Sequence, residues 1–135
     1  MHNVLSLIVE ATKKKIEVLK KNREAILSLV KSAPAPLSFK DAIHREGKIS
    51  IIGEIKQASP SSGILRKDFS PVALAKIFES SNINALSVVT EEEFFLGKIS
   101  YIEGIKKEVR VSRFFLLSVI FRLKPLIRIH RTPDK

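Results

Sequence analysis

Three polar side chains follow one another where a short apolar run ends. The run ISIIGEI, residues 49–55, contains Glu54, and Lys56 and Ser59 come next in the turn-forming stretch KQASPSSG. Because side chains alternate across a strand, Glu54 and Lys56 should share one face with Ile52. A lysine in a half-buried site can act as a general acid, and an adjacent carboxylate can accept a substrate hydroxyl or steady the ammonium group. A structural ion pair at the end of the strand is the alternative interpretation.

The elements around this stretch alternate between strand and helix. Residues 49–55 are typical of a strand buried on both faces, and residues 83–90 of a second one. Residues 70–82 and 99–109 predict helices, with short connections throughout. Such alternation indicates parallel strands with helices packed outside them. In sheets of this kind ligands bind at the carboxyl ends of the strands, where Glu54 and Lys56 lie.

The helix over residues 70–82 has the clearest boundary signals in the chain. Ser70 is suited to be its N-cap, and Pro71 fits the first helical position, where no backbone N–H is needed. The expected buried stripe consists of Val72, Leu74, Ala75, Ile77 and Phe78.

The first 48 residues read as helical. Apolar residues recur at intervals of three and four from Val4 to Lys31, which predicts one long or two short amphipathic helices. The basic run at 13–15 is either a solvated helix face or a phosphate-binding stripe. Residues 39–47 predict a short helix with Gly47 as its stop and His44 as a surface residue.

Composition limits the class of protein. With 135 residues, 44% hydrophobic and 28% charged, the chain has the length and composition of one globular domain. The absence of cysteine excludes disulfides and thiolate metal sites and fits a reducing compartment. No secretory signal is recognisable, and the run FFLLSVIF at 114–121 is too short to span a membrane. We therefore expect a cytoplasmic protein.

The stretch IIGEIKQASPSSGILRKDFSPVALAKIFESSNINALSVVTEEEFFLG closely resembles the indole-3-glycerol-phosphate synthase family. The first barrel strand and loop of that family read much like I-I-A-E-[IY]-K-[KR]-x-S-P-S-x-G, and its second strand and loop resemble ALSVVTEEEFFLG, residues 85–97. The resemblance covers roughly residues 3–112. It implies an α/β fold, the N-terminal portion of a (β/α)8 TIM barrel preceded by a helical extension, with the barrel incomplete.

The resemblance also implies a reaction and roles for particular residues. The family closes the indole ring of 1-(2-carboxyphenylamino)-1-deoxyribulose 5-phosphate, with loss of carbon dioxide and water, and uses no metal or organic cofactor. By resemblance Glu54 and Lys56 are catalytic, and the expected substrate-binding residues are Ser59, Ser61, Ser62, Gly63 and Phe95. Residues 61–63 would form a flexible loop over the substrate, with a plain turn as the alternative. Leu96 departs from the Asn or Gln common at its position, so no polar contact is implied there.

The resemblance stops near Ser112. The family continues with a third strand similar to x-P-x-L-[RM]-K-D-F, whose lysine is a main catalytic acid, and Ser118 falls on that lysine here. Residues 110–135 hold seven Lys or Arg against one acid, which gives +6 of the total +10. Either a frameshift or premature stop replaced the native continuation, or the tail is an adapted segment, for instance a basic amphipathic stretch that touches nucleic acid or an anionic membrane surface. We divide the chain into a helical extension (1–48), barrel units (49–112) and a tail (113–135).

These features lead to one principal expectation and two alternatives. An unclosed barrel leaves a sheet edge and an apolar face open, so self-association is expected, and activity of the isolated chain should be negligible. The first alternative is a non-enzymatic basic protein that binds polyanions through its tail. The second is another phosphate-binding barrel such as phosphoribosylanthranilate isomerase, which the E-x-K-x-x-S-P-S string argues against. Nucleic-acid binding is not expected, because no recognised nucleic-acid-binding pattern occurs.

Overall fold

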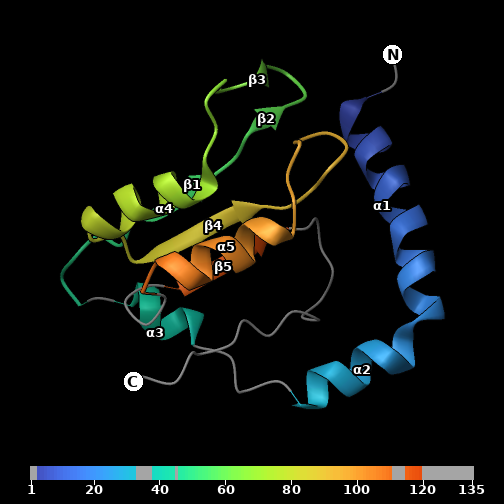
Figure 1. Cartoon of the computed structure of the whole chain (residues 1–135), viewed down its shortest axis with the longest axis horizontal. Helices are drawn as coiled ribbons and strands as arrows, with labels where there is room; N and C mark the ends of the chain where they lie inside the picture. Colours follow the sequence, from blue (N-terminus) through green and yellow to red (C-terminus); the bar gives the residue numbers. More distant parts are fainter. Residues whose placement is uncertain (1–2, 33–37, 45, 111–114, 120–135) are drawn as a thin grey trace.

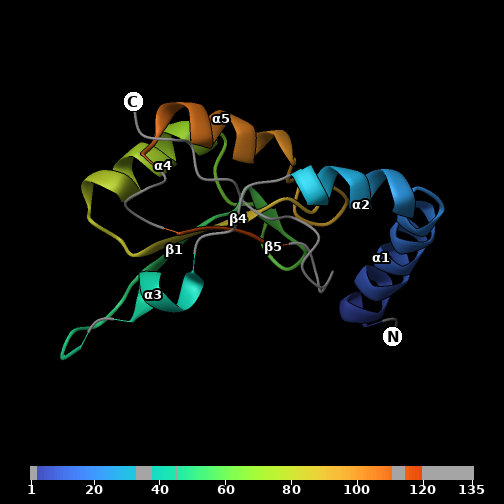
Figure 2. The same ribbon diagram turned by 90° about the horizontal axis from the view of Figure 1, so that it is seen from below.

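The core of the molecule is a parallel three-stranded sheet with two helices on one face (Figure 1). The computed structural model describes residues 3–32, 38–44, 46–110 and 115–119. The sheet has the order β1-β4-β5 and is formed by β1 (Ile52–Ile55), β4 (Ala85–Val89) and β5 (Phe115–Val119). Both pairings are parallel, with Glu54 opposite Ser87 and Val88 opposite Ser118. Helices α4 (Pro71–Ser80) and α5 (Ser100–Glu108) lie side by side on the sheet (Figure 2). The predicted α/β class and incomplete barrel are confirmed.

The N-terminal extension forms two helices, as one of the two expected arrangements had it. Helix α1 (Val4–Lys21) is capped by Asn3, whose side chain accepts the N–H of Leu5 at 3.1 Å. Asn22 separates it from α2 (Arg23–Ser32). Ile8 is the buried residue of α1, and α1 stands beside the loop that follows β4 (Figure 1).

Helix α3 (Phe39–Ile43) is shorter than predicted. Its last residue is Ile43, and His44 already has extended backbone with φ −82° and ψ 106°. The prediction that the helix runs to Gly47 is therefore wrong. The positive φ of Gly47, 66°, belongs to the turn that leads towards β1. His44 is exposed, as expected.

Strand β1 is covered on one face only, which corrects the expectation of a strand over 49–55 buried on both faces. Gly53 and Ile55 are buried, whereas Ile52 is 49% exposed. A Cβ at Gly53 would lie 3.0 Å from Ile83 Cδ1 and 3.1 Å from ring atoms of Phe78. Side chains on the face of the sheet covered by the helices therefore pack closely against Gly53. An apolar run does not reveal whether a layer covers its second face, so the exposure of Ile52 could not be predicted from the run alone.

Helix α4 begins as predicted. Pro71 is its first residue, and Ser70 Oγ accepts the N–H of Ala73 at 3.3 Å. Of the expected stripe, Ala75 is buried and Val72, Leu74 and Phe78 pack against the core. Ile77 is the exception, because it is 56% exposed. It lies two residues beyond Ala75, which places it on the opposite side of a helix with 3.6 residues per turn.

The centre of the sheet forms the core. All five residues of β4 are buried, which confirms the second predicted strand, and Leu86 and Val88 are fully enclosed. They cluster with Ile55 from β1 and with Ile102 and Ile105 from α5. The helix predicted over 99–109 is thus confirmed as α5 despite Gly104. The tail assigned to 113–135 lies, apart from β5, outside the described residues, and the division of the chain into three segments stays a prediction.

A small hairpin follows the carboxyl end of β1. It consists of β2 (Ala58–Ser59) and β3 (Gly63–Ile64), paired antiparallel with Ser59 opposite Gly63. Because β1 and β4 are parallel, this hairpin and the loop after β4 both leave the sheet at the carboxyl ends of the strands (Figure 1). The segments that carry the predicted site residues therefore lie at that end of the sheet.

Candidate active site

The Glu54–Lys56 pair predicted from the sequence forms at the end of β1. Lys56 Nζ lies 2.7 Å from Glu54 Oε1, and the side chains of Lys56 and Glu54 are 32% and 46% exposed. Exposed pairs of this kind contribute only about 0–1 kcal/mol to stability. Both charged groups can consequently turn towards a ligand at little cost in folding free energy. The predicted alternation along β1 is confirmed, since Ile52 and Glu54 are exposed while Gly53 and Ile55 are buried.

The serine-rich segment after Lys56 is folded into the hairpin by its own hydrogen bonds. Ser59 Oγ accepts the N–H of Ser62 at 3.2 Å and lies 3.5 Å from Ser61 Oγ. Gly63 has a φ of 64°, a conformation that favours glycine, and a Cβ there would meet no atom within 4 Å. The turn-forming character of this stretch is thus explained locally. Its role in covering a substrate stays a prediction.

The β4–α5 loop, residues 90–99, carries Phe95 and is organised around Glu91. Glu91 Oε2 accepts the N–H groups of Phe94 at 2.7 Å and Phe95 at 3.3 Å, and Oε1 accepts that of Glu93 at 3.2 Å. The carbonyl oxygen of Glu91 also accepts the N–H of Gly97 at 2.7 Å. One residue therefore fixes the backbone of the predicted substrate-binding aromatic, which is itself half-buried.

Glu91 is a buried carboxylate that stays ionised. Its side chain is 8% exposed, and Lys15 Nζ on α1 lies 3.1 Å from Oε1. Burial raises the pKa of Glu91, but the N–H of Phe94, the Lys15 ammonium and the N–H of Glu93 together outweigh it and leave the pKa below the usual range. The negative charge is therefore held in place by donors from two segments of the chain.

Backbone geometry limits which residues this loop tolerates. A Cβ at Gly97 would collide with the carbonyl oxygen of Val89 and approach that of Glu91 to 2.8 Å, so only glycine fits. Leu96 has a φ of 54°, in the left-handed region that a branched side chain adopts at a cost. The backbone of this loop is therefore closely packed at Gly97 and lies in a strained conformation at Leu96.

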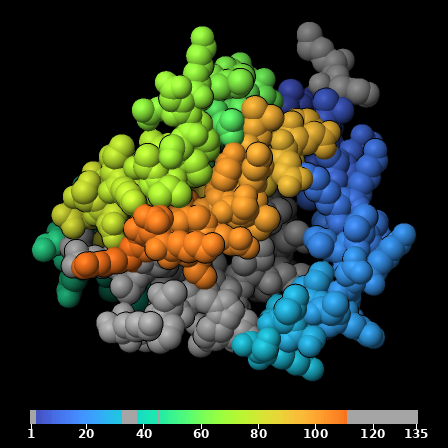
Figure 3. Space-filling view, in the orientation of Figure 1, coloured from blue at the N-terminus to red at the C-terminus, as the bar shows by residue number. Residues whose placement is uncertain are grey.

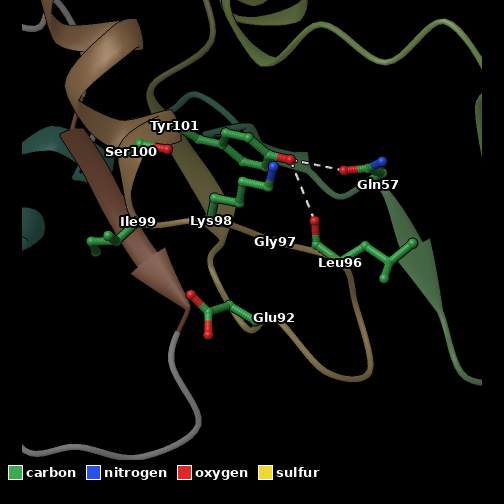
Figure 4. A pocket seen from close by; sticks show the side chains of 8 residues that line it. All are labelled: Gln57, Glu92, Leu96, Gly97, Lys98, Ile99, Ser100 and Tyr101. Carbon is green, nitrogen blue, oxygen red and sulfur yellow. Dashed lines mark hydrogen bonds between the residues drawn. The ribbon is translucent and has the colours of Figure 1, made fainter.

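A cleft of about 550 Å³ opens between the end of β1 and the start of α5 (Figure 4). Tyr101 lies in it, and its hydroxyl donates to Gln57 Oε1 at 2.8 Å and lies 3.3 Å from the carbonyl oxygen of Leu96. Burial raises the pKa of Tyr101, which favours the neutral phenol that makes these contacts. The cleft is lined by Gln57, Glu92, Leu96, Gly97, Lys98, Ile99, Ser100 and Tyr101.

The predicted site residues form two groups at the carboxyl ends of the strands. Glu54, Lys56 and the serines of the hairpin follow β1, and Phe95 follows β4. The sequence did not predict four residues that form polar contacts at the carboxyl ends of the strands: Lys15, Gln57, Glu91 and Tyr101. Two signals could have suggested part of this set, because Gln57 directly follows Lys56 and Tyr101 is the single tyrosine of the chain.

The described residues contain neither a metal-ligand cluster nor a membrane-spanning helix. Within the described ranges, no group of three or more His, Cys, Asp or Glu side chains could hold a metal ion. Among the helices of the same ranges, none is long and apolar enough to cross a membrane.

The fold and the position of the site define the class of protein. Parallel strands joined by helices on one face, with polar side chains gathered at the carboxyl ends, are the arrangement of successive units in a (β/α)8 barrel. The sequence model of the family described as indole-3-glycerol phosphate synthase matches residues 5–116. The chain belongs to the indole-3-glycerol phosphate synthase family.

Curated proteins of that name are similar to this chain over much of its length. An indole-3-glycerol phosphate synthase of Thermoanaerobacter sp. (strain X514) is 45% identical over 106 residues, which are 77% of this chain and 40% of that protein. One from Clostridium acetobutylicum is 42% identical over 99 residues, or 70% of this chain and 37% of that protein. A third, from Caldanaerobacter subterraneus subsp. tengcongensis, is 49% identical over 69 residues, or 51% and 27%. The chain thus matches two fifths or less of the length of these relatives.

Proposed function

We propose that this chain carries the first-strand part of the substrate site of an indole-3-glycerol phosphate synthase. The reaction is the ring closure of 1-(2-carboxyphenylamino)-1-deoxyribulose 5-phosphate, with decarboxylation and dehydration, in tryptophan biosynthesis. The observation that carries the proposal is the solvent-accessible Glu54–Lys56 contact of 2.7 Å at the end of β1. A cytoplasmic location and a phosphorylated small-molecule substrate belong to the same proposal.

Each site residue has a role that its chemistry allows. The Lys56 ammonium binds the substrate and donates a proton, and the Glu54 carboxylate orients that ammonium or accepts a substrate hydroxyl. Ser59 offers a hydroxyl from the hairpin, whose residues 61–63 cover the substrate. Phe95 lines the pocket beside the aromatic ring. Two observations support these roles: the chain belongs to the family, and these residues lie together at the carboxyl ends of the strands.

Turnover by this chain alone should be negligible. The third strand, where the family has a catalytic lysine, reads FLLSV in β5 and pairs Ser118 with Val88. This sequence contains no titratable residue and therefore supplies no general acid from β5. Catalysis needs acid, base and phosphate anchors held together, so one wall of a site binds a ligand weakly without stabilising the transition state.

Ligand binding and turnover by the purified chain test this proposal. We expect no indole-forming rate above background, and weak binding of indole-3-glycerol phosphate, the reaction product, in about the millimolar range. Lys56→Ala should abolish the binding. Lys67→Ala removes an exposed lysine from the segment after the hairpin and should leave binding unchanged. Binding that survives Lys56→Ala would contradict the role of Lys56, and a robust rate would contradict the incomplete site.

We also propose that the chain self-associates through its open sheet edge. Strand β1 is at the edge of the sheet, and three isoleucines on or next to it are exposed, Ile49 by 88%, Ile51 by 58% and Ile52 by 49%. Unpaired edges with apolar side chains are templates for pairing with another chain. Size-exclusion chromatography with light scattering should show dimers or larger species, and a monodisperse monomer across the accessible concentrations would refute the proposal.

A further inference from the structure

Helix α1 meets the β4–α5 loop at one buried carboxylate. Lys15 and Glu91 are 76 positions apart in the sequence, yet their side chains form a hydrogen bond of 3.1 Å. Glu91 is 8% exposed and Lys15 is 47% exposed, so the pair is buried at the loop end and open at the helix end. The space-filling view shows α1 directly beside this loop (Figure 3).

The same carboxylate sets the backbone of the loop. Its two oxygens accept the N–H groups of Glu93, Phe94 and Phe95 in addition to the Lys15 ammonium. Hydrogen bonds to a charged acceptor are about twice as strong as those between neutral groups. A shift of the Glu91 carboxylate would therefore change the position of the Phe95 backbone.

A cleft of about 450 Å³ lies between α1 and the loop, lined by Leu7, Glu10, Ala11, Lys14, Lys15, Glu93 and Phe94. Ile8 is the buried residue of α1, and the other apolar side chains of the helix that face outward, such as Leu5 and Val9, are 51% and 41% exposed. Among the described residues, the Lys15–Glu91 ion pair is a specific polar contact between the helix and the loop.

We propose that Lys15 and Glu91 form a latch by which α1 positions the β4–α5 loop, and with it Phe95, for the substrate. The identity of that substrate rests on the proposed function, whereas the latch itself rests on the contacts between α1 and the loop. Lys15 and Glu91 are positioning residues, because they act on the site through the loop backbone. The N-terminal extension thereby becomes part of the substrate site although no residue of α1 need touch the ligand.

Amide hydrogen exchange of the full chain, without ligand, tests the latch. Lys15→Met keeps the length and apolar stem of the side chain but removes its charge. Exchange at the amides of Glu93, Phe94 and Phe95 should become about three- to tenfold faster. Lys14→Met is the matched control, since Lys14 lines the same cleft and precedes Lys15 on the same helix, and it should leave these amides unchanged. Lys15→Arg should restore protection, because it restores the cation.

The outcomes separate the latch from the proposed function. Unchanged exchange in Lys15→Met, an equal rise in Lys14→Met, or a rise spread evenly over β4 and α5 would each overturn the latch. A rise confined to the loop and reversed by Lys15→Arg supports it, whether or not the chain binds product. If the wild-type chain binds indole-3-glycerol phosphate, Lys15→Met should weaken that binding about threefold or more, and Lys14→Met should not.

Discussion

The two ion pairs at the edge of the sheet have similar lengths and opposite surroundings. Glu54 and Lys56, joined at 2.7 Å, are two residues apart at the end of β1, and their side chains are 46% and 32% exposed. Glu91 and Lys15, joined at 3.1 Å, come from distant segments, and Glu91 is buried among backbone donors. The charged groups of the first pair can bind a ligand instead of each other, whereas the second pair holds the backbone of the β4–α5 loop in place. Distance alone therefore does not separate a chemical site from a structural anchor, but burial and the number of donors do.

The largest effect on stability is expected from a substitution at Gly97 in the β4–α5 loop. Gly97→Ala would place a methyl group against the carbonyl oxygens of Val89 and Glu91, and we expect a loss of about 3 kcal/mol or more in the free energy of unfolding. Chemical denaturation measures it. Gly104→Ala is the control, because its Cβ would lie 3.4 Å from Val72 Cγ2, an ordinary contact, and alanine favours the α5 helix by up to about 1 kcal/mol. Equal effects of the two substitutions would refute the close packing of the loop at Gly97.

Neutralising each carboxylate tests the comparison directly. Glu91→Gln should lower the free energy of unfolding by about 1–2 kcal/mol at neutral pH, because it weakens several charge-assisted bonds. Glu54→Gln should change it by less than about 0.5 kcal/mol. If the Glu54 substitution proves the more destabilising, the assignment of the two pairs is reversed.

The same variant gives a pH dependence with a definite sign. The pKa of Glu91 is lowered in the folded state, so its contribution is complete above the ordinary glutamate value of 4.5 and is lost as pH falls through the folded pKa. Wild type should therefore lose stability below about pH 4.5 relative to Glu91→Gln. A constant difference between the two proteins across that range would show that Glu91 is not held ionised by the fold.

A further prediction concerns Tyr101 in the cleft between the end of β1 and the start of α5. Burial raises the pKa of Tyr101, so its phenol should ionise above the ordinary tyrosine range, and the associated stability is lost as pH rises through that folded pKa. Because the chain has one tyrosine and no tryptophan, an ultraviolet absorbance titration reports this group alone. Tyr101→Phe should lose the signal and about 0.5–1.5 kcal/mol of stability with the bond to Gln57. Ionisation at or below the ordinary value would contradict the partly buried, hydrogen-bonded phenol.

The smallest expected effect sharpens the account of loop strain. Leu96 has a φ of 54°, so Leu96→Gly should stabilise the protein by about 0.5–1 kcal/mol. Leu96→Ala is the control that removes most of the side chain but keeps the backbone cost, and it should give no gain. A shift in thermal midpoint for glycine but not alanine would confirm the strain, and no difference between them would dismiss it.

The extent to which sequence predicted these features follows from how local their causes are. Ser70 and Pro71 mark the start of α4 because capping depends on adjacent residues, and the Glu54–Lys56 pair follows from alternation along one strand. The exposure of Ile52 could not be predicted, since it depends on whether a second layer covers β1. The Lys15–Glu91 contact also escaped, because nothing in a run of three lysines shows which of them meets a carboxylate 76 residues away.

The most direct test of the central claim is a nuclear magnetic resonance titration of the labelled chain with indole-3-glycerol phosphate. We expect amide shift changes at the end of β1, in the hairpin around Ser59 and in the β4–α5 loop at Phe95, and we expect Lys56→Ala to abolish all of them. Changes confined to the lysine-rich face of α1, or changes that persist in Lys56→Ala, would contradict the assignment of the Glu54–Lys56 edge as the substrate site.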